Sequence, residues 1–133
     1  MTQHEPAGVP SIRTDRLTRR FGAFTAVENL SFDIRPGVLV AFLGPNGAGK
    51  STTMRMLTGF LSPSSGSAQI LGRDVTTDRV EAARHLGYLP ENGPLYPDMT
   101  PLGLLRFLGA MRGMSASAIR ERLDVVVDQC RLA

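Results

Sequence analysis

The segment Gly44-Pro45-Asn46-Gly47-Ala48-Gly49-Lys50-Ser51 decides how the rest of this 133-residue chain is interpreted. It fits the pattern G-x-x-x-x-G-K-S/T, whose glycines let backbone N–H groups turn toward phosphate oxygens that side chains would otherwise obstruct. A helix that begins just after the glycines adds unpaired N–H donors and a partial positive charge. The segment therefore predicts a loop that binds the phosphates of a nucleotide, with a glycine-rich turn that binds no ligand as the alternative.

The residues of this loop have separate expected roles. Lys50, the only lysine of the chain, is expected to reach the β- and γ-phosphates and to serve catalysis there. The Ser51 hydroxyl is expected to ligate Mg²⁺, and Thr52 is placed to contact a phosphate oxygen. The remaining contacts to the nucleotide are expected from the loop itself, at Gly44, Pro45, Asn46, Gly47, Ala48 and Gly49.

The residues on the N-terminal side of the loop predict its structural setting. Residues 38–43 are six apolar residues without alternation, a pattern typical of a strand buried on both faces in a parallel sheet. Looser alternation at 11–20 and 26–34, followed by a turn at 35–37, predicts an antiparallel unit in front of that strand. The expected fold class is α/β, with a parallel sheet of the P-loop type, an antiparallel β subdomain and the beginning of a helical subdomain.

Shorter elements are expected after the loop. In chain order they are a helix from 50 to about 58, a strand at 68–71, a helix at 78–85, a strand at 87–89, and helices at 101–111 and 115–132. Four prolines within residues 90–101 predict an ordered loop or hinge before the last two helices. These boundaries divide the chain into a flexible leader at 1–10, a nucleotide-binding core at 11–100 and the start of a helical subdomain at 101–133.

Composition and charge argue against several other classes of protein. The net charge is +3, but the basic residues are scattered, form no run of five and are not interleaved with aromatic side chains. Binding of nucleic acid is therefore not expected. No apolar run approaches the roughly 20 residues that span a bilayer, and residues 1–10 lack the features of a signal peptide. With Cys130 as its only cysteine, the chain is expected to be soluble and cytoplasmic.

The residues around the loop resemble those at the start of ATP-binding cassette (ABC) ATPase subunits. The resemblance covers residues 11–133 and rests on Leu17-Thr18-Arg19-Arg20-Phe21-Gly22, on 26–32, on 44–53, and on Gly87-Tyr88-Leu89-Pro90-Glu91 with 95–100. The last two stretches look like the family's Q-loop region, particularly in export-type bacterial members. The resemblance implies that ATP binding and hydrolysis drive transport through a separate integral membrane permease. It also implies an ATPase dimer, either a homodimer or a paired ATPase subunit, on the inner face of the cell membrane.

The resemblance implies roles for further residues. Phe21 occupies the position whose aromatic ring stacks on adenine, with Phe24 as a weaker alternative and internal packing as the other role for Phe21. Glu91 stands where the family usually has glutamine. It is expected to act as a catalytic residue and an Mg²⁺ ligand, or else to face solvent. The contact with the permease is expected at Leu95, Tyr96 and the apolar face of 102–111, with internal packing of these residues as the alternative.

Three further family motifs are not found in residues 1–133: the signature sequence, the Mg²⁺-binding aspartate with its catalytic glutamate, and the switch histidine. Residues 123–128 end in an aspartate, but their apolar positions continue one helical face, and Gln129 follows instead of glutamate. The chain is therefore expected to be the N-terminal part of a cassette and to be inactive in hydrolysis by itself. The alternatives are a soluble ABC-type ATPase without a role in transport and a nucleotide-binding fragment without turnover.

Overall fold

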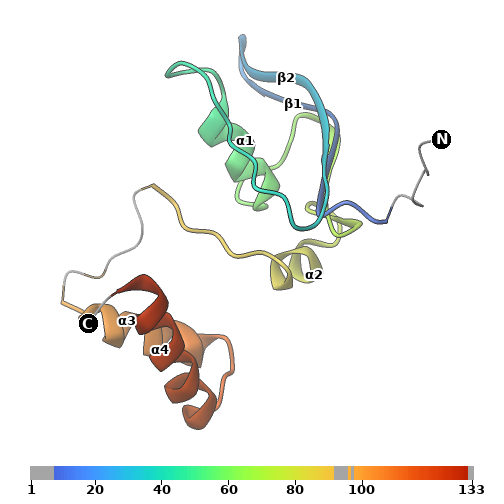
Figure 1. The fold of residues 1–133 in the computed structure, drawn as a ribbon. Helices are drawn as coiled ribbons and strands as arrows, with labels where there is room; N and C mark the ends of the chain where they lie inside the picture. The colour runs from blue at the N-terminus through green and yellow to red at the C-terminus, as the bar shows by residue number, and fades with distance from the viewer. Residues whose placement is uncertain (1–7, 92–95, 97, 132–133) are drawn as a thin grey trace. The chain divides into compact units, whose positions relative to one another are not determined.

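The computed structural model describes residues 8–91, 96 and 98–131. Contacts between residues divide the chain into two compact units, Met1–Tyr88 and Leu89–Ala133, and each unit is described by itself (Figure 1). The division falls just before the proline-rich segment that the sequence predicts as a loop or hinge. The first unit contains the glycine-rich loop, and the second contains the predicted start of the helical subdomain.

A four-stranded antiparallel sheet forms the framework of the described part of the first unit. Its strands, in the spatial order β2-β1-β3-β4, are β1 (Ile12–Phe21), β2 (Phe24–Ile34), β3 (Ser65–Ile70) and β4 (Arg73–Asp74). β1 and β2 form a hairpin, in which Phe21 pairs with Phe24 next to the turn. The antiparallel unit predicted at 11–20 and 26–34 is confirmed. The strand expected at 68–71 is longer than predicted and begins at Ser65.

The helix α1 (Lys50–Leu57) packs against this sheet, as Figure 1 shows. Its buried residues are Thr53, Met56 and Leu57, whose spacing places them on one helix face. The short helix α2 (Arg79–Arg84) adds one more buried residue. The core of the unit consists of Leu17, Val27, Met56, Leu57, Ala68, Ile70, Val75 and Ala82. Because Leu17 of β1 and Met56 of α1 are both 0% exposed, the centre of this core lies between the sheet and α1.

Residues 38–43 form no strand in the structure, so the prediction of a buried strand there was wrong. The exposed fraction of Leu39 is 101% and that of Leu43 is 89%. Phe42 is half-buried, and its ring centroid lies 5.5 Å from that of Phe32 in an edge-on contact. A strand inside a parallel sheet needs neighbouring strands for its backbone and helices over both faces. No described strand pairs with residues 38–43, and the strand predicted at 87–89 is likewise not formed among the described residues.

Two helices, α3 (Pro101–Met111) and α4 (Ala116–Cys130), make up the regular structure described in the second unit. Each helix begins at a hydroxyl cap: the Thr100 hydroxyl accepts from the Gly103 amide at 3.1 Å, and the Ser115 hydroxyl accepts from the Ala118 amide at 3.2 Å. Both predicted helices are confirmed, and residues 123–128 lie within α4. No helix in the described ranges is long and apolar enough to cross a membrane.

Candidate functional site

The glycine-rich loop leads directly into α1, which begins at Lys50. Gly49 is the N-cap of the helix, in the left-handed conformation with φ 83° and ψ 5°. Among the described residues, no side chain caps this helix end and no acidic residue lies in its first turn. The amide groups of the first turn therefore point out of the helix without side-chain acceptors, and the helix dipole adds positive character. A helix end of this kind favours the binding of an anion.

Gly49 lies so close to β2 that no side chain fits at this position. A Cβ atom on Gly49 would lie 2.4 Å from the carbonyl oxygen of Ala26 and 3.0 Å from Cγ2 of Val27. From within α1, the Thr53 hydroxyl donates to the carbonyl oxygen of Gly49 at 2.9 Å. The end of the loop is thus fixed on one side by β2 and on the other by Thr53. The sequence prediction did not assign a role to Thr53. Its only signal was its residue type, because a threonine within a helix can donate to the carbonyl four residues earlier.

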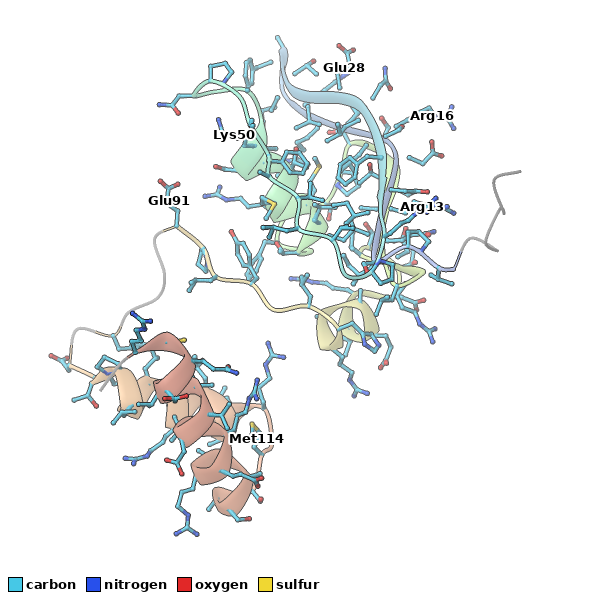
Figure 2. The ribbon with its side chains drawn as sticks, in the orientation of Figure 1. Arg13, Arg16, Glu28, Lys50, Glu91 and Met114 are labelled. Atoms are coloured by element: carbon cyan, nitrogen blue, oxygen red, sulfur yellow. The ribbon has the colours of Figure 1, made fainter. Side chains whose placement is uncertain are left out.

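The side chain of Lys50 folds back over the loop. Its Nζ atom donates to the carbonyl oxygen of Gly44 at 2.5 Å and to that of Pro45 at 2.7 Å. A backbone turn between the Ala48 amide and the Pro45 carbonyl, 3.2 Å apart, closes the loop further. Both acceptors of Lys50 are neutral, and a phosphate oxygen forms a stronger, charge-assisted bond with an ammonium group. Figure 2 shows Lys50 at the loop end of α1, while Arg13 and Arg16 point away on the other side of the sheet.

The hydroxyl groups next to Lys50 fit a bound Mg²⁺ ion. Ser51 is exposed, and Thr52 is half-buried, in the first turn of α1. Mg²⁺ in nucleotide sites takes one or two oxygen ligands from the protein and the others from phosphate and water. The described residues offer the Ser51 hydroxyl for this purpose, whereas no three His, Cys, Asp or Glu side chains among them come together.

Phe21 lies at the end of β1, with its side chain 47% exposed. Phe24, its partner across the turn, is 62% exposed. The described core residues do not include Phe21, and one face of its ring is covered by Arg19, whose Cζ atom lies 4.6 Å from the ring centroid. Figure 1 shows the tip of the β1–β2 hairpin and the loop before α1 at the same end of the unit. The hairpin end that carries the exposed ring and the glycine-rich loop therefore lie at the same end of the first unit.

The other predicted site residues belong to the second unit. Glu91 is exposed, and its role as an Mg²⁺ ligand stays a prediction. Tyr96 is 51% exposed, and its ring contacts that of Phe107 in α3 edge-on, with centroids 6.0 Å apart. Leu95 lies outside the described residues.

A bidentate ion pair on the β1–β2 hairpin lies away from the loop. Arg13 donates from Nε and Nη2 to the two carboxylate oxygens of Asp33, both at 2.9 Å. These hydrogen bonds lower the pKa of the Asp33 carboxyl and raise the pKa of Arg13. Both side chains are about half exposed, so the pair acts on the surface of the hairpin and not in the candidate site.

A glycine-rich loop that opens an uncapped helix at a lysine and a serine defines a nucleotide-binding protein of the P-loop class. A family model described as "ABC transporter" matches residues 27–132, which is well over half of the chain. The chain belongs to the family of ABC transporter ATP-binding proteins. It has the α/β fold of that family as an incomplete cassette, an antiparallel sheet accompanied by helices.

Three similar proteins show how much of a cassette is present. Probable multidrug ABC transporter ATP-binding protein YbhF of Escherichia coli is 38% identical over 124 residues, which cover 91% of this chain and 22% of that protein. Nod factor export ATP-binding protein I of Ralstonia nicotianae is 35% identical over 137 residues, which cover 99% of this chain and 43% of that protein. A solved structure of an ATP binding subunit of an ABC transporter, 30% identical, matches 91% of this chain and 50% of its own with a TM-score of 0.79. The chain thus spans half or less of the proteins it is similar to.

Proposed function

We propose that this chain is the nucleotide-binding part of an ABC transporter subunit that couples ATP binding and hydrolysis to transport through a membrane permease. The observation that carries the proposal is the uncapped start of α1 at Lys50, behind a glycine-rich loop, in a chain of this family. One relative is named for multidrug transport and another for Nod factor export. These names support transport as the purpose and export as its direction.

The phosphates of ATP are proposed to bind where the loop meets α1. Lys50 exchanges the carbonyl oxygens of Gly44 and Pro45 for the β- and γ-phosphates, because the new bonds join opposite charges. Backbone amides of residues 44–49 and of the first helical turn, together with Thr52, donate to the other oxygens. Ser51 ligates Mg²⁺, which when bound neutralises part of the phosphate charge.

Two residues outside the loop complete the proposed site. Phe21 stacks on the adenine, which its exposed ring at the hairpin end supports. Glu91 acts as a second protein ligand of Mg²⁺ and as a catalytic residue, since a carboxylate oxygen is a hard ligand that this ion accepts. For residues 1–133 by themselves we propose nucleotide binding without turnover, because this sequence contains no aspartate–glutamate pair after an apolar strand.

The proposed partners are a second ATPase subunit and a membrane permease. Tyr96 and apolar side chains of α3, among them Leu102, Leu108 and Met111, are exposed and form the proposed contact with the permease. In this arrangement the protein is cytoplasmic and lies on the inner face of the cell membrane.

Titration calorimetry with Mg²⁺ and ATP tests the proposal on the unchanged chain and on Lys50→Ala. Charge-assisted hydrogen bonds contribute about 1.5–3 kcal/mol each. Lys50→Ala is therefore expected to weaken ATP binding by a factor of roughly ten or more. Arg55→Ala serves as the matched control, because Arg55 is an exposed cation in the last turn of the same helix. Equal affinities for the unchanged chain and Lys50→Ala would contradict the assignment of the loop.

A further inference from the structure

The guanidinium group of Arg19 is held in place over the ring of Phe21. Both residues lie on β1, and Cζ of Arg19 is 4.6 Å from the ring centroid of Phe21. On its other side, Nη1 of Arg19 donates to the carbonyl oxygen of Ser62 at 2.8 Å, in the loop that follows α1. Two separate contacts, one to the strand and one to the loop, therefore fix the position of this guanidinium.

The position of Arg19 is not the one that best satisfies its own hydrogen bonds. Its Nε atom is buried and donates to no acceptor among the described residues. A buried donor without a partner costs free energy, which the contacts with Phe21 and Ser62 must offset. An arginine that only needed solvation could extend into water, as the neighbouring Arg20 does with a side chain 60% exposed.

The contact determines how the ring of Phe21 can be used. Phenylalanine has no polar group that could fix its orientation through a hydrogen bond, so packing alone has to orient the ring. Arg19 covers one face, and the side chain as a whole is still 47% exposed. The exposed part of the ring is available to a planar partner, and that partner does not have to order the ring when it binds.

We propose that Arg19 is a positioning residue for the nucleobase: it holds the ring of Phe21 from behind, so that guanidinium, phenyl ring and adenine form one stack. This inference rests on the proposed function, in which Phe21 receives the base of ATP. Arg19 itself touches neither the base nor the phosphates. Its effect is therefore confined to ligands that contain a base.

Binding titrations with two ligands, ATP and inorganic triphosphate, test this role on the full chain. Arg19→Ala is expected to weaken ATP binding roughly three- to tenfold, the range that one cation–π contact allows, and to leave triphosphate binding unchanged. In a Phe21→Ala background, Arg19→Ala is expected to have no further effect on ATP. Arg20→Ala, which removes the same charge one residue away, is expected to change neither affinity.

Arg19→Lys keeps the positive charge and the hydrocarbon stem, so it is expected to recover part of the ATP affinity. Thermal unfolding of each variant shows whether it is folded. If Arg19→Ala is not folded, Arg19→Lys is used in its place for the titrations. Two results would overturn the positioning role of Arg19. The first is that Arg19→Ala weakens the binding of ATP and of triphosphate equally. The second is that Arg19→Ala weakens ATP binding as much in the Phe21→Ala background as in the unchanged chain. If Phe21→Ala itself leaves ATP binding unchanged while Lys50→Ala abolishes it, the stacking role of Phe21 fails and the phosphate site stands. If Lys50→Ala changes neither ligand, the proposed function itself fails.

Discussion

The Nζ atom of Lys50 lies 2.5 Å from the carbonyl oxygen of Gly44, so the side chain proposed to bind phosphate also closes the loop on itself. Binding of a nucleotide then exchanges one set of partners for another, and the loop does not start from an open, solvated lysine. This relationship makes the chemical accessibility of Lys50 a direct reporter of the site.

Amine-reactive labelling provides the first prediction, because Lys50 is the only lysine in the chain. The reagent is expected to modify Lys50 and the N-terminal amine and nothing else at low excess. ATP with Mg²⁺ is expected to slow the modification of Lys50 and leave that of the N-terminus unchanged, since the ammonium is then held by phosphates. Peptide mass spectrometry over a time course measures both rates, and identical Lys50 rates with and without ATP would rule out contact with the nucleotide.

Substitution of two loop glycines is expected to have unequal effects on stability. Gly47→Ala places a side chain at φ 85° with no described atom within 4 Å of its Cβ, so it carries only the left-handed penalty, about 1–2 kcal/mol. Gly49→Ala has the same backbone penalty and also forces Cβ against the carbonyl oxygen of Ala26. Its loss in the free energy of unfolding is expected to reach roughly 3 kcal/mol or more. Denaturant titrations of both variants measure the difference, and equal losses would show that α1 does not depend on its contact with β2.

Exchange of Glu91 for glutamine tests the proposed second ligand of Mg²⁺. In the full-length protein, Glu91→Gln removes the negative charge of the proposed ligand and replaces its carboxylate by a neutral amide. ATP affinity in the presence of a chelator is expected to stay similar or become tighter, and the gain on adding Mg²⁺ is expected to shrink. Nucleotide titrations under both conditions give this comparison. If Mg²⁺ increases the ATP affinity of both proteins by the same factor, Glu91 is a solvated residue and not a ligand of the ion.

The ion pair between Arg13 and Asp33 predicts a dependence of stability on acidic pH. Because the pKa of Asp33 is lowered from 3.8 in the folded chain, its contribution is fully present above that value and is lost as the pH falls through the lowered pKa. The effect is small, since both side chains are exposed and salt screens them. Asp33→Asn is expected to be slightly less stable than the unchanged chain at pH 7 and equal to it below the folded pKa. A difference that persists unchanged in strong acid would point to a cause other than charge.

The elements that the sequence predicted well are those whose signals are local. Alternation over residues 12–34 predicted the hairpin, and the spacing of apolar residues predicted that α1 and α4 are helices. The buried face of α1 was predicted less well, because Met56 is 0% exposed whereas Met54 is 40% exposed. The strand expected at 38–43 depends on partners far away in the chain, and its apolar pattern alone could not supply them. Local composition indicated burial of this segment, but it contained no information about a cover, and Leu39 and Leu43 are exposed in the structure.

The candidate site was predictable to a similar extent. The motif located Lys50, Ser51 and the loop, because phosphate chemistry requires those residue types at that spacing. The contact of Gly49 with Ala26 and that of Arg19 with Phe21 depend on strand register and side-chain rotamers. Neither can be derived from motif spacing, so the residues that hold the loop and the aromatic ring in place came only from the structure.

Residues 38–43 carry six apolar side chains without a charge or a proline, and Leu39 and Leu43 are almost completely exposed. Segments of this composition, when uncovered, pair edge to edge with copies of themselves and stack into insoluble assemblies. We expect self-association through this segment to compete with folding while the segment lacks a cover, and to grow with protein concentration. We therefore expect these six residues to lower the concentration at which the uncovered chain precipitates.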